Sequence, residues 1–175
     1  GEAAGFALVE RASDQDSLIR LIGMGESQDA HHMSSPHPEG LGARLAMQRA
    51  LISGNLTPEA IDFVLLHGTG TVSNDSAEDA GMSRLLGPGK PCASIKGAIG
   101  HTLGAAGITN ALAGALCLES QFSPGTQNTQ TPEPCLRFDL RLTPESRALQ
   151  RIMSNAFGFG GINTSLVLER SQDPQ

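Results

Sequence analysis

Short apolar runs alternate with helical patterns along the chain. Near its start, the runs Phe6–Val9 and Leu18–Met24 predict two strands. The polar segment Ser27–Pro38, with two prolines and three histidines, predicts a loop. Apolar residues then recur at helical spacing over Glu39–Ser53, which predicts an amphipathic helix. This alternation of strands and helices is typical of an α/β protein.

The remainder of the chain continues the same alternation. Ile61–Leu66 predicts a buried strand that stops at His67, and Pro91–Ile95 predicts a short strand that ends at Lys96. The other predicted elements are a short turn from Thr57 and Pro58, a helix after Asn74 with an acidic first turn, a small-residue helix over Leu103–Glu119, a loop over Ser123–Pro134, and two strands over Arg151–Ala156 and Thr164–Glu169. The sequence therefore predicts a layered sheet with helices on both faces and with reactive residues at the ends of strands.

Composition and charge exclude several classes of protein. The 175 residues include 39% hydrophobic and 17% charged residues, which suits one folded domain, or a large half of a two-part fold, over residues 1–175. A net charge of −6 without a stripe of lysine and arginine argues against nucleic-acid binding. No apolar run approaches the roughly 20 residues that cross a bilayer, so we expect no membrane partner.

Cysteines and loop histidines give no sign of a disulfide framework or a metal site. The three cysteines are Cys92, Cys117 and Cys135. An odd number without close pairs is typical of a reducing compartment, so we expect a cytoplasmic protein. His31, His32 and His37 lack the companion spacing of a zinc site, which favours a solvated loop or a pocket rim without a metal.

Chemistry-bearing residues gather in three glycine-rich clusters. The first runs from His67 to Thr71 and on to Asn74, Asp75 and Glu78, the second combines Ser94–Gly97 with Gly100–Gly107, and the third is Asn155–Asn163. A strand that delivers His67 into a Gly/Thr turn places an imidazole at a sheet edge, where glycines let a long, thin ligand approach the backbone. The hydroxyls of Thr69 and Thr71 can bond to an amide-bearing chain.

His101 and Lys96 lie close together in the sequence, at a helix start and a strand end. The positive end of the helix dipole disfavours an imidazolium, so we expect His101 to be neutral and to donate one N–H to a developing oxyanion. Lys96 can set the local potential. Two neutral imidazole donors beside a cation suit the stabilisation of an enolate.

Each cluster also has a purely structural interpretation. A histidine at a strand end is more often a satisfied structural residue than a catalyst. The run 100–107 can serve close helix packing, and it lacks the spacing of a phosphate-binding loop. The run Phe157–Gly161 can form a tight β turn with buried phenylalanines. Two histidines and a lysine among glycines give weight to a functional interpretation, and chemistry alone leaves both open.

The three clusters, in this order and spacing, resemble those of the elongating β-ketoacyl-acyl-carrier-protein synthases. The opening Gly1–Gly5 with Val9 and Glu10 resembles the strand that begins the second half of that family, and Asp29–Pro36 is similar to a family loop near the substrate entrance. The resemblance covers nearly the whole chain. It implies a thiolase-like half, in a fragment or processed chain that lacks the N-terminal half with its nucleophilic cysteine.

The resemblance also implies a reaction. An acyl group is transferred from carrier protein to a cysteine, and decarboxylative Claisen condensation with malonyl-carrier protein follows. His67 and His101 would promote decarboxylation and stabilise the enolate, with Lys96 supporting them. Thr69 and Thr71 would hold the phosphopantetheine arm, which the carrier protein supplies, so no cofactor of the chain's own is expected.

Further roles follow from the same resemblance. Phe159 would gate the pocket from a mobile glycine-rich loop. The residues implied in supporting or loop-switching roles are Asp75, Glu78, Phe157, Gly158 and Gly160. The expected partners are the acyl carrier protein, the N-terminal synthase half and a second subunit in a homodimer or heterodimer.

Two positions depart from the family pattern. Asn110 stands where the family usually has a glutamate that interacts with the lysine region, which puts the charge balance around Lys96 in question. Ala156 stands where many members have serine. The pair of His67 and His101 fits the elongating type, because the initiating type carries a histidine and an asparagine. The departures favour a specialised branch, such as the building of secondary metabolites.

Other functions compete with a condensing enzyme. A non-catalytic partner of the chain-length-factor kind tends to lose active-site residues, and the retention of His67, Lys96 and His101 speaks against it. An inert fragment or binding module would expose half of a shared core. A thiolase proper would show a second cysteine in a C-terminal Cys-Gly motif, and no cysteine lies near Gly160 and Gly161.

Overall fold

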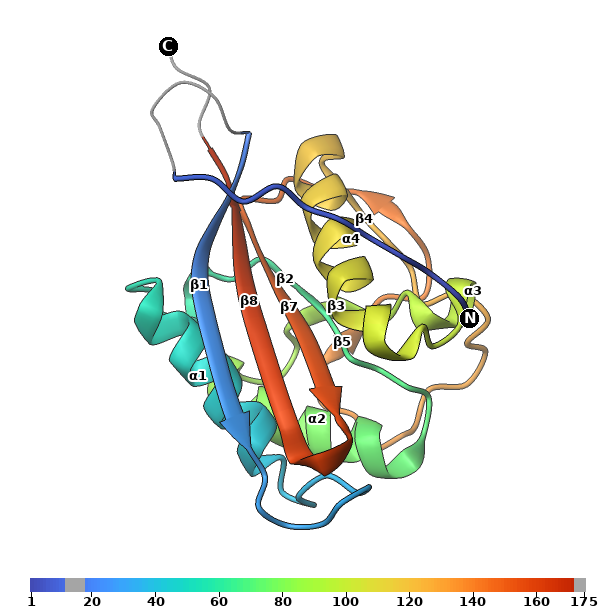
Figure 1. Ribbon diagram of the computed structural model, residues 1–175. Coiled ribbons are helices and arrows are strands. Elements are labelled where there is room, and N and C mark those ends of the chain that lie inside the picture. Colours follow the sequence, from blue (N-terminus) through green and yellow to red (C-terminus); the bar gives the residue numbers. More distant parts are fainter. Residues whose placement is uncertain (12–17, 172–175) are drawn as a thin grey trace.

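A six-stranded mixed sheet organises the part of the protein that the computed structural model describes, residues 1–11 and 18–171. Its strands follow the order β1-β8-β7-β2-β3-β5 (Figure 1). They are β1 (Ile19–Gln28), β2 (Phe63–Leu65), β3 (Pro91–Ala93), β5 (Asp139–Leu140), β7 (Arg151–Gly158) and β8 (Ile162–Arg170). A separate antiparallel pair joins β4 (Phe122–Ser123) to β6 (Glu145–Ser146).

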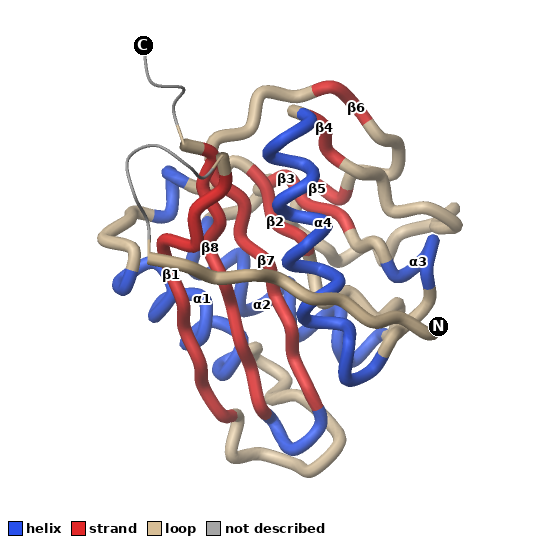
Figure 2. The backbone as a smooth tube through the Cα atoms, turned by 45° about the horizontal axis from the view of Figure 1, so that its top comes forward, coloured by secondary structure: helices blue, strands red, loops and turns tan. Residues whose placement is uncertain are grey.

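Helices cover both faces of the sheet. On one face lie α1 (Leu41–Ser53) and α2 (Val72–Leu86), and on the other lies α4 (Ala106–Ser120) (Figure 1 and Figure 2). The short helices are η1 (Pro58–Ala60), α3 (Lys96–Ile99), η2 (Leu103–Ala105) and η3 (Phe159–Gly161). The predicted α/β architecture, a layered sheet with helices on both faces, is confirmed.

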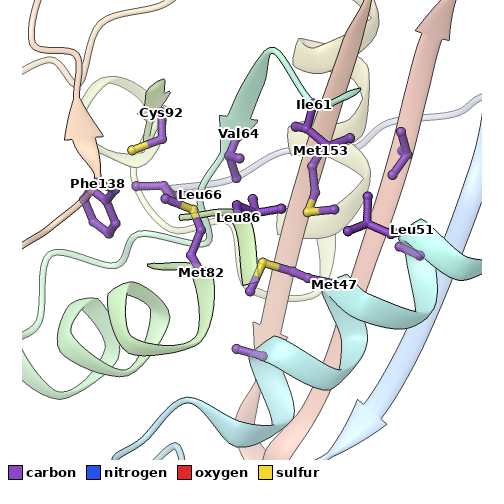
Figure 3. Close-up of a cluster of buried hydrophobic side chains, with 13 residues drawn as sticks. Met47, Leu51, Ile61, Val64, Leu66, Met82, Leu86, Cys92, Phe138 and Met153 are labelled. Atoms are coloured by element: carbon purple, nitrogen blue, oxygen red, sulfur yellow. The ribbon is translucent and has the colours of Figure 1, made fainter. Parts of the chain in front are cut away.

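The side chains around β2 contribute to two hydrophobic cores. Val64 and Leu66 pack on the side of α1 and α2, together with Met82 (Figure 3). Phe63 and Leu65 pack on the side of α4. Because successive side chains of a strand point to opposite faces, a strand covered by helices on both sides needs apolar residues at every position. This requirement explains the continuous apolar run that predicted the strand.

Parallel pairing brings the ends of the central strands to one edge of the sheet. β2 pairs in parallel with β3 on one side and with β7 on the other, so that Leu65 lies opposite both Ala93 and Ser154. The chain therefore leaves β2 towards His67, and β3 towards Lys96, at the same edge. β7 and β8 form an antiparallel hairpin that η3 closes.

One predicted strand is wrong. Residues 1–11 contain no helix or strand, and Phe6 of the predicted strand Phe6–Val9 is 93% exposed. The segment runs over α4, where Gly5 lies against Ile108 (Figure 1). A strand needs a neighbour that takes up its backbone hydrogen bonds, and none of the described strands pairs with this segment.

Other predicted elements are confirmed with shifted ends. The strand predicted over Leu18–Met24 is the longer β1, and the helix predicted after Asn74 is α2, which begins slightly earlier. The helix predicted over Leu103–Glu119 divides into η2 and α4. At the start of this segment Leu103 adopts a left-handed backbone with a φ of 51°, which is incompatible with a regular α-helix.

Gly25 of β1 is a position where we expect no side chain to fit. A Cβ atom at Gly25 would lie 2.1 Å from the backbone oxygen of Ala46 and 2.4 Å from the backbone nitrogen of Ala50, so β1 and α1 would have to separate. We expect Gly25→Ala to lower the free energy of unfolding by about 1–3 kcal/mol, as measured by urea unfolding.

The matched control for this substitution is Gly104→Ala. A Cβ atom at Gly104 would meet no atom within 4 Å, so we expect a change below about 0.5 kcal/mol. If Gly25→Ala were as stable as the wild-type protein, the close packing of β1 on α1 would be refuted.

Candidate active site

His67 leaves the buried end of β2 and is itself only 6% exposed. Its backbone N–H donates to Oε1 of Glu78 at 2.9 Å. The next residue, Gly68, has a φ of 43°, and a Cβ atom there would lie 2.6 Å from the Cβ of Ser94. Glycine meets both demands of this turn, the left-handed backbone and the close contact. The glycine that follows His67 in the sequence therefore sets how the imidazole leaves the strand.

Glu78 holds this turn from α2. Its almost fully buried carboxylate accepts the N–H groups of His67 and Gly68, both at 2.9 Å, and Nδ2 of Asn155 at 3.1 Å. Burial raises the pKa of Glu78, while these hydrogen bonds act in the opposite direction. Glu78, expected in a supporting role, thus binds the backbone of the turn that carries His67.

Lys96 opens α3, and its ammonium group donates to the backbone oxygen of His67. Burial lowers the pKa of Lys96, whereas the charges of Glu78 and Asp75 raise it. The backbone of His67 is therefore held at its N–H by a carboxylate and at its oxygen by an ammonium group. Asp75, which sits in the first turn of α2, acts on this ammonium group through its charge.

His101 faces His67 across the site. Their ring centroids are 5.4 Å apart and their planes meet at 80°. Nδ1 of His101 accepts the backbone N–H of Leu103 at 3.0 Å, so the neutral ring carries its proton on Nε2. The sequence attributed this neutrality to the dipole of a helix that begins just after His101, but α4 begins only at Ala106. Burial and the charge of Lys96 lower the pKa of His101.

The ring of His67 is held neutral more strongly. Burial, followed by the charges of Lys96 and His101, lowers its pKa from 6.5 to about 3. Among the described residues, its Nδ1 is buried without a hydrogen-bond partner. A buried and unpaired polar atom is unusual in a folded protein, and such atoms concentrate at functional sites. The site thus presents two neutral imidazoles beside one ammonium group.

The β7–β8 hairpin brings one phenylalanine to the site and leaves the other exposed. The ring of Phe157 lies 5.8 Å from that of His67, whereas Phe159 in η3 is 81% exposed. Gly160 has a φ of 81°, and its N–H donates to the backbone oxygen of Met33 at 2.7 Å. The contact of Phe157 with the imidazole was not predicted from the sequence, which drew attention to Phe159.

The loop that carries His31, His32 and His37 lies beside this hairpin. The backbone N–H of Asp29 donates to the backbone oxygen of Gly161 at 2.8 Å, and Gly158 ends β7 opposite Ile162. His32 is exposed, and the other two loop histidines contact each other with ring centroids 5.1 Å apart. Across the residues described, no three His, Cys, Asp or Glu side chains are arranged to hold a metal ion.

A cavity of about 460 Å³ opens beside these groups. The sequence-predicted residues that line it are Gly68, Thr69, Gly70, Asp75, Glu78, Ser94, Lys96, Gly97 and His101. Oγ1 of Thr69 lies 2.8 Å from Oγ1 of Thr71, which is exposed. Residues 126–133 form part of the wall and were predicted only as a loop. Their run of threonine, asparagine and glutamine, which can bond to an amide-bearing ligand, was the available signal.

Asn110 contacts backbone oxygens. It lies on α4, is 2% exposed, and its Nδ2 donates to the backbone oxygens of Leu65, Leu66 and Asn155 at 3.1–3.3 Å. The carboxylates whose charges act on Lys96 come from α2. At position 110, where the sequence raised a question about the charge balance around Lys96, the structure therefore has a neutral side chain that donates hydrogen bonds to two strands.

Acid should destabilise the protein partly through His67. The folded protein excludes a proton down to pH about 3, whereas the unfolded chain binds it near 6.5, so stability falls as pH is lowered between these values. We expect the wild-type protein to lose roughly 4 kcal/mol more than His67→Gln over this range, measured by urea unfolding. His31→Gln, at an exposed position, is the control and should behave like the wild type. Equal losses in His67→Gln and the wild type would contradict the neutral, buried imidazole.

The chain matches one protein family over most of its described length. The sequence model described as "Beta-ketoacyl synthase, C-terminal domain" matches residues 18–130. Among curated proteins, the 3-oxoacyl-[acyl-carrier-protein] synthase 2 of Vibrio cholerae is 36% identical over 97% of this chain. The chain covers 44% of that protein, so it spans less than half the length of the relative it matches.

Solved structures agree with this match. A ketosynthase (ApeO) in complex with its chain length factor (ApeC) from Xenorhabdus doucetiae matches 90% of this chain and 40% of its own, with 41% identity and a TM-score of 0.81. A second match is the structure of a type II PKS acyl-carrier protein in complex with its ketosynthase bound to the hexaketide. The match covers 89% of this chain and 39% of the other, with 27% identity and a TM-score of 0.85. The fold is therefore the thiolase-like half that the sequence predicted. The chain belongs to the β-ketoacyl synthase family.

Proposed function

We propose that this chain forms the C-terminal part of a 3-oxoacyl-carrier-protein synthase, an acyltransferase of fatty-acid or polyketide synthesis. The reaction is the decarboxylative Claisen condensation of acyl and malonyl thioesters. The observation that carries the proposal is the pair of neutral imidazoles, His67 and His101, with centroids 5.4 Å apart. Lys96 is bonded to the same residue, His67.

The pair suits the chemistry of malonyl decarboxylation. When the bond to the carboxylate breaks, CO₂ leaves and the electron pair moves into an enolate whose charge rests on the thioester oxygen. A neutral imidazole can donate an N–H to that oxygen, and the Nε2–H of His101 is the donor that its bond from Leu103 leaves available. The enolate carbon then attacks the acyl thioester, and the departing thiolate regenerates the cysteine.

Neutral donors have an advantage over imidazolium ions here. An imidazolium could protonate the enolate and end the reaction before the carbon–carbon bond forms. The depressed pKa values of His67 and His101 keep both rings neutral near pH 7. Burial lowers both pKa values, and the charge of Lys96 lowers them further while it also favours the developing anion. One cation thus supports the two requirements together.

The nucleophilic cysteine is assigned to residues outside this chain. Burial raises the pKa of Cys92 and raises that of Cys117 to about 11, so neither thiol supplies a thiolate near pH 7. Cys135 is exposed and does not line the cavity beside His101. The N-terminal part, which the longer relatives contain, is therefore the proposed source.

The remaining predicted residues have proposed roles around the cavity. Thr69 and Thr71 hold the phosphopantetheine arm of an acyl carrier protein, and the chain needs no cofactor of its own. The Gly158–Gly160 turn allows Phe159 to move as a gate, with Phe157 already against His67. Glu78 and Asp75 support this arrangement from α2.

The assembly is proposed from the same relatives. Ketosynthases among the matched structures are complexed with an acyl-carrier protein or a chain length factor, and a homodimer or heterodimer is expected here. A role as the non-catalytic partner is the competing function. The facing pair of His67 and His101 favours the catalytic subunit. Three free cysteines in the described chain agree with a cytoplasmic location.

Substitutions of His101 test the role of one defined N–H. We expect His101→Ala in the full-length protein to reduce malonyl decarboxylation at least about 100-fold, because a lost oxyanion donor costs that order of rate. His101→Gln, whose amide nitrogen can reach the position of Nε2, should recover about ten-fold of that loss. Release of CO₂ from malonyl-carrier protein is measured. A wild-type rate in His101→Ala would refute the assignment, as would a wild-type rate in His67→Ala.

The isolated chain should not catalyse the condensation of acyl and malonyl thioesters. Because the thiols of Cys92 and Cys117 are buried and the exposed Cys135 does not line the cavity, we expect no acyl-enzyme on Cys92 or Cys117 and no 3-oxoacyl product from acyl-carrier and malonyl-carrier protein. Mass spectrometry of the protein and of the carrier-bound product provides the measurement, and the full-length protein is the positive control. Product formed by the purified chain alone would place the nucleophile within it and overturn the proposal.

A further inference from the structure

The two strands that lead into the site separate where the site begins. β2 and β7 pair in parallel from Phe63 opposite Ile152 to Leu65 opposite Ser154. Beyond that point the chain of β2 turns into His67, while β7 continues its pairing with β8. A buried backbone oxygen at the end of such a ladder needs another donor, because leaving it unpaired is costly.

The side chain of Asn110 supplies that donor from α4. Its Nδ2 lies 3.2 Å from the oxygen of Leu65, 3.3 Å from that of Leu66 and 3.1 Å from that of Asn155. Three acceptors around one atom identify it as the amide nitrogen, since a carbonyl oxygen there would face three other oxygens. Within the described chain its Oδ1 has no hydrogen-bond partner. The side chain is thus committed to the two strand ends.

These contacts form a closed set of hydrogen bonds around the peptide group that joins Leu66 to His67. The oxygen of this peptide group accepts from Asn110, and its N–H donates to Glu78. Glu78 also accepts from the side chain of Asn155, and the backbone oxygen of Asn155 accepts from Asn110. A peptide group held at both ends cannot rotate without breaking a buried hydrogen bond.

The same set of hydrogen bonds is linked through the chain to Phe157, the aromatic neighbour of the His67 imidazole. From Asn155 the chain passes through Ala156 to Phe157, whose ring lies 5.8 Å from that of His67. We propose that Asn110 is a positioning residue that fixes His67 and Phe157 relative to each other through the backbone oxygens of β2 and β7. The inference rests on the function proposed above for His67 and adds a residue that bonds to backbone oxygens and does not line the cavity.

Aspartate and leucine at this position separate hydrogen bonding from packing. Aspartate has nearly the shape of asparagine but donates only while protonated, and burial among backbone oxygens favours the protonated form at low pH. Leucine fills a similar volume and donates at no pH. The titratable side chains of the surrounding network, Glu78 on α2, Lys96 on α3 and His67 after β2, are common to both variants.

The experiment follows CO₂ release from malonyl-carrier protein by the full-length protein between about pH 6 and 9. We expect Asn110→Leu to lower kcat about ten-fold or more at every pH, since misplaced groups cost at least that factor. Asn110→Asp should stay within about three-fold of wild type near pH 6 and fall at least ten-fold further towards pH 9. Wild-type kcat in Asn110→Leu, or an Asn110→Asp profile parallel to wild type, would overturn the proposal.

Ser120→Ala is the matched control on the same helix. The Ser120 hydroxyl donates to the backbone oxygen of Leu116 at 2.6 Å and is exposed, with no bond to β2 or β7. We expect its kcat to equal that of the wild type at each pH. A loss in Ser120→Ala as large as that in Asn110→Leu would trace the effect to α4 as a whole and overturn the specific role of Asn110.

Hydrogen exchange separates this inference from the function on which it rests. If the wild-type protein releases no CO₂, the role proposed for His67 fails, but Asn110→Leu should still speed exchange of the His67 amide about ten-fold. Unchanged exchange there would overturn the positioning role whatever the activity. If Asn110→Leu loses protection throughout α1 and is therefore unfolded, the same exchange measured in Asn110→Asp near pH 6 and pH 9 decides the question.

Discussion

The parallel pairing of β2 with β3 and β7 is the constraint on which the site depends. Strands that run in parallel end at the same edge, so His67, Lys96 and the residues after Asn155 emerge together although they are distant in sequence. Parallel neighbours also need a crossover, and α2 is the crossover between β2 and β3. Because that helix starts at the same edge, its first turns carry Asp75 and Glu78 back to His67. The position of the acidic residues is thus a consequence of the topology.

Once the strands are paired, side chains fix the backbone of His67, and within the described chain none of them bonds to the buried Nδ1 of its ring. The carboxylate of Glu78 takes the N–H groups of the turn, and the ammonium group of Lys96 takes the oxygen of His67. Both charged groups therefore form hydrogen bonds with the backbone of this turn. This division explains how the backbone of His67 can be held in place while its ring makes no hydrogen bond through Nδ1 to any described residue.

The sequence was sufficient for the parts of the structure that local patterns determine. The run Ile61–Leu66 and the glycine after His67 are dictated by burial and by a left-handed backbone, so the strand and its turn could be predicted. The strand predicted over Phe6–Val9 failed because strand formation depends on a partner that a local pattern does not reveal. The contact of Phe157 with His67 and the reach of Asn110 were missed for the same reason, since both arise only when distant strands meet.

The electrostatics of the site set two demands against each other. An enolate is stabilised by positive charge, yet the donors that bind it must stay neutral, because a charged imidazole would be an acid strong enough to quench the carbanion. Burial, together with the charge of Lys96, depresses the pKa values of His67 and His101, and Glu78 and Asp75 balance the charge of Lys96 itself. Lys96 therefore contributes to both demands. A further carboxylate near the strand ends would raise the pKa of His67 and so make its ring easier to protonate. A neutral residue at position 110 therefore suits the site, since it supplies the hydrogen bonds that the strand ends need without adding charge.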